Sequence, residues 1–169
     1  MDPYSPEQWH DFFVTVGSGA AALTGLVVVA MALHLEAIVR DTALKNRAKG
    51  ALTGLAGVFA RCALVLMGGQ SGQAVAFELF AVCAVFGGSS LADFWQVLRD
   101  PEPTPRVFIY RWVCLIACYV VEMIGAVLLF LGFSAGLYVV GVAMVSSLYF
   151  MISASWLLLV GISQDRAAR

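Results

Sequence analysis

Charged residues are scarce in this sequence. Only 12% of its 169 residues are Asp, Glu, Lys or Arg, whereas soluble domains contain about 25%. The 10 basic and 11 acidic residues leave a net charge of −1 at pH 7, so the chain has no basic patch large enough to hold a nucleic-acid backbone. An ordinary soluble domain is therefore excluded, and we expect no nucleic acid among the partners.

Residues that commonly carry catalysis or bind metals are also few. His10 and His34 are the only histidines, and they lie near opposite ends of one predicted helix, so they cannot clamp a haem within one chain. The sequence has no His–Glu metal motif and no Ser–His pair. All four cysteines lie within apolar runs, which is typical of small buried side chains. We expect no cofactor, no metal site and no enzymatic activity.

Apolar residues, in contrast, make up 61% of the chain. They form five runs with the length that a helix needs to cross a hydrocarbon core about 30 Å thick. The runs cover residues 12–35, 51–68, 74–95, 108–131 and 136–161. The connections 68–73 and 132–135 are so short that the helices they join must be antiparallel neighbours. The sequence therefore predicts an all-α fold: one polytopic membrane domain over residues 1–169, with five transmembrane helices in a lipid bilayer.

Basic residues gather on one side of this predicted bundle. All of them except Arg61 lie at the ends that follow the first, third and fifth runs. They are Arg40, Lys45, Arg47, Lys49, Arg99, Arg106, Arg111, Arg166 and Arg169. Cytoplasmic segments of membrane proteins carry an excess of Lys and Arg. We therefore predict that the N-terminus is outside and the C-terminus is cytoplasmic.

The first span has a recognisable start. The segment Ser5-Pro6-Glu7-Gln8 is typical of a helix N-terminus, with Ser5 as the cap and Pro6 in the first helical position. We expect this helix to continue unbroken to about Arg40, which makes it longer than the membrane core is thick. No basic residue precedes the apolar run, so the positive segment of a signal peptide is lacking. We expect the first span to be retained.

Three ionisable residues lie deep inside the predicted spans, namely Arg61, Glu78 and Glu122. Charges in hydrocarbon are costly, and they are usually paired or functional. Arg61 and Glu122 both lie about 15 Å from the inner face at 1.5 Å per residue, so they can meet near the midplane. Glu78, on the next span after Arg61, can also reach it. Two interpretations remain open: an ion-pair lock between three helices, or a surplus carboxylate that binds a cation or a proton.

One stripe of the first span has acids at both ends and small or hydroxylated residues in its outer half. At helical spacing it comprises Asp11, Thr15, Ser18, Ala22, Gly25, Val29, Leu33, Glu36 and Arg40. A pore-lining helix has this pattern, because a ring of Asp11 would concentrate cations and Val29 with Leu33 would form a hydrophobic gate. The alternative is close packing, since residues such as Gly17 and Gly25 let helix backbones approach each other.

The N-terminal quarter carries a resemblance to known proteins. The segment from Glu7 to Gly17 reads EQWHDFFVTVG and continues into an alanine- and glycine-rich span that ends near Leu35. This region resembles the start of small integral membrane proteins of unknown function from high-GC bacteria. The resemblance implies a multi-pass protein of the bacterial inner (plasma) membrane, and it implies no activity.

Two classes of function fit these observations. The first is a homo-oligomeric membrane channel or permease for cations, protons included, whose pathway is lined by the first helix. Five short helices are too few to enclose a pathway alone, so several subunits would assemble around an axis. The alternative is a non-transporting scaffold or regulatory subunit that binds a membrane-protein partner within a larger complex.

Overall fold

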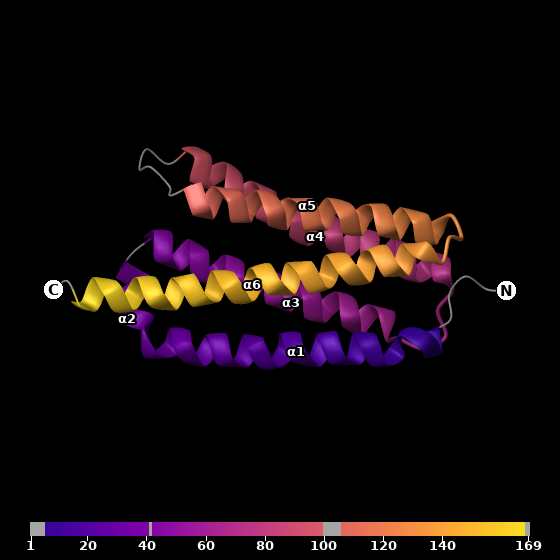
Figure 1. Ribbon diagram of the computed structural model, residues 1–169, viewed down its shortest axis with the longest axis horizontal. Helices are drawn as coiled ribbons and strands as arrows, with labels where there is room; N and C mark the ends of the chain where they lie inside the picture. The colour runs from indigo at the N-terminus through magenta and orange to yellow at the C-terminus, as the bar shows by residue number, and fades with distance from the viewer. Residues whose placement is uncertain (1–5, 41, 100–105, 168–169) are drawn as a thin grey trace.

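Residues 6–40, 42–99 and 106–167 are described in a computed structural model, and they form six α-helices (Figure 1). The helices are α1 (Pro6–Leu33), α2 (Leu35–Arg40), α3 (Thr42–Val65), α4 (Gly72–Arg99), α5 (Arg106–Phe130) and α6 (Ala135–Ala167). All except the six-residue α2 are long and apolar enough to cross a membrane. The predicted all-α fold with five helices able to span a bilayer is therefore confirmed.

The first helix begins as predicted but ends early. α1 starts at Pro6, whereas the proposed cap, Ser5, lies outside the described residues. The prediction of an unbroken helix to Arg40 is wrong, because the helix breaks at His34, whose N–H donates to the Met31 carbonyl three residues back at 3.1 Å. The short helix α2 then turns onto α3 and buries Ile38. Burial of that apolar side chain favours the break over a straight continuation.

α3 is the central helix of the bundle. It packs against α1, α4 and α6, while α5 packs against α4 and α6 (Figure 1). The main core contains buried side chains from all five long helices, including Phe13, Val58, Leu79, Leu129 and Leu137. The start of α1 and the end of α6 lie at opposite ends of the bundle, as an odd number of crossings requires.

Two short connections produce antiparallel pairs, as predicted. α3 and α4 pack together, and α5 packs closely against α6. Gly132, with φ +86°, lies just beyond the last residue of α5. The Phe133 N–H donates to the Leu128 carbonyl at 2.9 Å, which is the pattern of a glycine C-cap. At Gly136 a Cβ atom would lie 2.5 Å from the backbone nitrogen of Leu129. Glycine at this position therefore allows α5 and α6 to approach closely.

Candidate functional site

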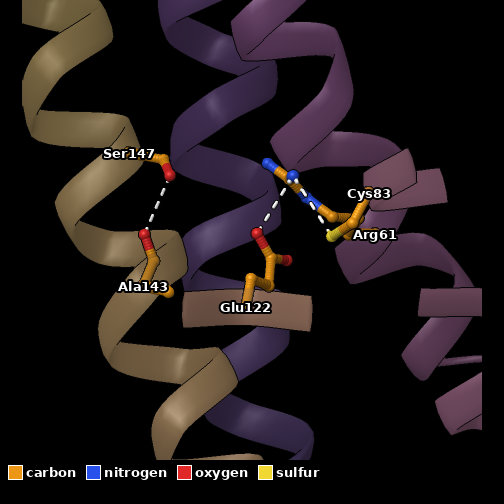
Figure 2. A network of polar contacts seen from close by, with 5 residues as sticks. All are labelled: Arg61, Cys83, Glu122, Ala143 and Ser147. Carbon is orange, nitrogen blue, oxygen red and sulfur yellow. Dashed lines mark hydrogen bonds and ion pairs between the residues drawn. The ribbon is translucent and has the colours of Figure 1, made fainter. Parts of the chain in front are cut away.

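An ion pair lies at the centre of the bundle. Arg61 on α3 and Glu122 on α5 have fully buried side chains, and Arg61 Nη1 lies 3.1 Å from Glu122 Oε2 (Figure 2). α3 and α5 both pack on α4 and α6, so the two side chains meet in the space between those helices. The structure thus brings together Arg61 and Glu122, which the sequence predicted could meet.

Two further side chains surround the Arg61 guanidinium. Nη1 donates to the Cys83 sulfur on α4 at 3.8 Å (Figure 2). The guanidinium carbon lies 5.1 Å from the centre of the Tyr119 ring on α5. The second contact has the distance of a cation–π interaction. Arg61 therefore contacts a carboxylate, a thiol and an aromatic ring, which together connect α3 to both α4 and α5.

The pair is held by charge more than by well-aligned hydrogen bonds. Among the described residues, Arg61 Nε and Nη2 and both Glu122 oxygens have no hydrogen-bond partner with suitable geometry. Each buried polar atom without a partner costs about 1–3 kcal/mol, so mutual neutralisation of the two charges is the main compensation. Protonation of Glu122 would leave Arg61 with an uncompensated charge in the core. The geometry therefore supports a structural lock more than a free proton carrier.

Glu78 lies apart from this pair. Its two carboxylate oxygens accept hydrogen bonds from Gln70 Nε2 at 2.9 and 2.8 Å, and Gln70 belongs to the connection between α3 and α4. The side chain is half-buried. The structure thus pairs Arg61 with Glu122 and gives Glu78 a different partner. The sequence left open a second, surplus carboxylate beside Arg61. In the described contacts, the carboxylate beside Arg61 is that of Glu122, whereas Glu78 contacts Gln70.

The stripe on the first helix faces away from the rest of the bundle. Every one of its residues from Asp11 to Leu33 is exposed, with Val29 60% and Leu33 73% exposed. The opposite face of α1 carries the buried residues Phe13, Val16 and Ala20. At 3.6 residues per turn the two sets lie on opposite sides of the helix. The stripe is therefore available to a second subunit, to lipid or to a water-filled pathway.

The break at His34 shortens this stripe. Glu36 lies in α2, beyond the break, where its carboxylate forms an exposed ion pair with Arg40. The acid at the inner end is thus not on the same continuous helix as Asp11. The predicted stripe from Asp11 to Arg40 lies on one continuous helix only as far as Leu33, because α1 ends there and α2 turns onto α3.

The small residues of α1 divide into two groups. A Cβ atom at Gly17 would lie 2.9 Å from the Cβ of Cys62 on α3, so this glycine allows α1 and α3 to pack closely. A Cβ atom at Gly25 or Gly19 would meet no atom within 4 Å. Close packing inside the subunit therefore explains Gly17 but does not explain Gly25.

Sequence reasoning did not identify two residues of the central cluster. Tyr119 lies three positions before Glu122 on the same helix, so the spacing of helix neighbours could have revealed it. Cys83 had no comparable signal, because it is one small residue within an apolar run. Within residues 6–40, 42–99 and 106–167, no three His, Cys, Asp or Glu side chains come together as metal ligands would.

Comparison of the chain with protein-family models, with curated proteins and with solved structures found no match.

Proposed function

We propose that this protein is a homo-oligomeric membrane channel or permease for cations, with the outward face of α1 from several subunits lining the pathway. The observation that carries the proposal is the exposure of Asp11, Thr15 and Ser18 on the side of α1 that none of the other described helices covers. Carboxyl and hydroxyl groups facing hydrocarbon would be unfavourable. Contact with water between subunits would satisfy them.

The pathway of this proposal runs between subunits and not through one of them. The centre of a single bundle is filled by Arg61 and Glu122 at one level and by Phe13, Leu79 and Leu137 in the core, all with no exposure. A cation would have to displace these side chains to pass. The central pair instead holds α3 and α5 in position and so keeps α1 correctly placed on α3.

The stripe supplies the chemical features that cation passage requires. Asp11 from each subunit would form a negative ring at the outer mouth and raise the local concentration of cations. Thr15 and Ser18 would offer oxygen atoms to partly hydrated ions. Further along the helix, Val29 and Leu33 would form an apolar constriction, which blocks ions when it loses water. Glu36, beyond the break, would lie at the inner mouth.

The orientation and location are part of the proposal. Arg40 and Arg99 are the last residues of α2 and α4, and Lys49 lies near the start of α3. These helix ends lie together at the end of the bundle where α1 finishes (Figure 1). Exposed aromatic side chains at the same end, Trp95, Tyr110 and Trp156, suit a membrane–water boundary. We place this end in the cytoplasm by the positive-inside rule and place the protein in a bacterial inner membrane.

The experiment that tests this function has two parts. The oligomeric state of the detergent-solubilised protein is measured first, and a ring of at least four subunits is expected. The purified assembly is then placed in liposomes, and fluxes of potassium, sodium and protons are compared with those of empty vesicles. Cation flux from the assembled ring supports the proposal. An assembled protein that gives no flux above empty vesicles removes it.

A second function, that of a non-transporting subunit of a larger membrane complex, is favoured by a feature of α4 and α5. Phe77, Phe80 and Phe130 are exposed and line, with Ala76, Ala126 and Val127, a groove of about 110 Å³. A helix of a partner protein could place apolar side chains there. A stable monomer without ion flux, which copurifies with one membrane protein in a fixed ratio, would support this function.

A further inference from the structure

A small pocket is lined by residues of α3, α5 and α6. It lies toward the end of the bundle where α3 and α5 begin. Its volume is about 60 Å³, and its lining includes Arg47, Arg111, Trp112, Met151 and Ala154. A single water molecule needs a cavity of only about 10–15 Å³, so the pocket has room for a group of several atoms. Two arginines from different helices thus face one compact and otherwise apolar space.

Arg111 has unused hydrogen-bonding capacity. Its Nε and Nη2 atoms are buried and have no hydrogen-bond partner among the described residues. A guanidinium with two free N–H groups on one side favours an anion that can accept both, such as a phosphate or a carboxylate.

The depth of the pocket matches the level of phospholipid headgroups. Arg47 lies near the start of the apolar segment Leu44–Val65, and Arg111 lies near the start of Ile109–Phe130. Ala154 lies near the end of the segment Ala135–Trp156. All three therefore lie at one boundary of the hydrocarbon core. Phospholipid phosphates occupy this level, and basic pockets between transmembrane helices commonly hold them.

We propose that this pocket binds an anionic phospholipid, with its phosphate held between Arg47 and Arg111. The upper part of an acyl chain would lie along the apolar wall formed by Leu115 and Met151. Free inorganic phosphate shares the chemistry of the headgroup, but it would leave this apolar wall uncovered. Burial of both parts of the ligand favours the lipid. The proposal is independent of cation transport.

The test measures thermal unfolding of the full-length protein in a neutral detergent. Phosphatidylglycerol, phosphatidylcholine or inorganic phosphate is added at increasing concentration, and the affinity is obtained from the rise in Tm. Phosphatidylglycerol should raise the Tm at much lower concentration than the other two. Arg111→Gln and Arg47→Gln should each weaken this effect about tenfold or more, as expected for the loss of a hydrogen bond between charged groups.

Two matched controls separate the pocket from general attraction of anions. Lys45→Gln removes a positive charge from an exposed residue near the same end, and it should keep the wild-type affinity. Ala154→Phe fills the pocket without a change of charge and should abolish the preference for phosphatidylglycerol. Ile152→Phe makes the same kind of change at an exposed position of the same helix outside the pocket lining, and it should preserve the preference.

Several results would overturn the assignment. Equal protection by phosphatidylglycerol and phosphatidylcholine would show that no anion site exists, and equal weakening by Lys45→Gln and Arg111→Gln would show attraction to the whole surface. If inorganic phosphate protects the protein at the same concentration as the lipid does, the ligand of the pocket would be a free anion and not a phospholipid. If Arg111→Gln fails to fold, Arg111→Lys and Ala154→Phe decide the outcome, and wild-type affinity in both would also contradict the proposal.

Discussion

Arg61 on α3 and Glu122 on α5 compensate each other's charge inside the bundle, with 3.1 Å between Nη1 and Oε2 and no exposure of either side chain. Because the two residues belong to helices that are far apart in the sequence, their pairing fixes how α3 and α5 are placed around α4 and α6. In the packing shown in Figure 1, α3 and α5 lie close enough for this pair to form. We expect the pair to favour this packing over alternatives that leave either charge unpaired, whatever its net contribution to stability.

Breaking this pair should destabilise the protein strongly. Arg61→Leu leaves Glu122 as a buried and uncompensated charge, which typically costs about 3–5 kcal/mol. Arg61→Leu combined with Glu122→Leu should recover much of this loss, because no charge then remains. The free energy of unfolding of the single and double variants in detergent gives the coupling energy.

Glu78→Gln is the matched control for this cycle. Glu78 is also an acid on a membrane-spanning helix, but it accepts hydrogen bonds from Gln70 and not from Arg61. The change that Glu78→Gln causes in the free energy of unfolding should simply add to the change that Arg61→Leu causes. Coupling of Arg61 to Glu78 instead of Glu122 would show that the pairing described here is wrong.

Gly17 and Gly25 should respond differently to enlargement. At Gly17 a Cβ atom would already lie 2.9 Å from Cys62, so Gly17→Leu should cost about 1–3 kcal/mol through overpacking between α1 and α3. At Gly25 a Cβ atom meets nothing within 4 Å, so Gly25→Leu should leave the stability of the isolated subunit unchanged. Thermal unfolding in detergent at a dilution that gives monomers checks both expectations, and equal destabilisation would contradict them.

The sequence was sufficient for the number of helices long and apolar enough to span a membrane and for the antiparallel pairs, because apolar runs of membrane length leave few alternatives. Hydropathy did not reveal the full length of α3, which begins at Thr42. The predicted run starts at residue 51, because basic residues such as Lys45 and Lys49 lower the hydropathy of the first turns of the helix. These long side chains can extend their charged ends to the membrane surface while their backbone stays helical.

The break at His34 and the choice of Glu122 over Glu78 could not be predicted. Both depend on packing between segments distant in sequence: α2 leaves the axis of α1 to bury Ile38 near α3, and Glu122 reaches Arg61 from α5. The periodicity of a single helix contains no information about such contacts. The stripe of α1 was predictable as a pattern down to Leu33, but its exposure depends on how α1 packs against α3.

The orientation predicted from the basic residues can be tested by labelling. On a background without the four native cysteines, Ser71→Cys places a thiol at the connection between α3 and α4, whereas Arg40→Cys places one at the opposite end of the bundle. A membrane-impermeant maleimide added to intact cells should modify position 71 and spare position 40. Disrupted membranes, in which both positions should react, serve as the control. The reverse pattern in intact cells would overturn the proposed topology.

Asp11→Asn should lower cation flux most strongly at low ionic strength. The proposed ring of carboxylates attracts cations over a distance that falls as the Debye length shortens, from about 10 Å at 0.1 M salt to about 3 Å at 1 M. Flux into liposomes is therefore measured at both salt concentrations. Glu78→Gln removes the same charge from the same end of the bundle, but from α4 instead of α1, and it should have little effect. An equal loss in both variants, or a loss that salt does not change, would argue against the ring.

The apolar constriction gives the sharpest test of a pathway along α1. Val29 lies on the stripe and is 60% exposed, whereas Val28, the residue before it, is 48% exposed but points about 100° away around the helix. Val29→Ser should hydrate the constriction and raise the basal flux of the assembled protein. Val28→Ser makes the same substitution beside the proposed pathway and should leave the flux unchanged. Flux is measured in liposomes after the assembly of each variant has been checked, because a loosened ring would also leak. If both valine variants leak equally, or if neither differs from wild type, the stripe does not line a pathway; an increase confined to Val29→Ser would place that side chain at the point where ions are held back.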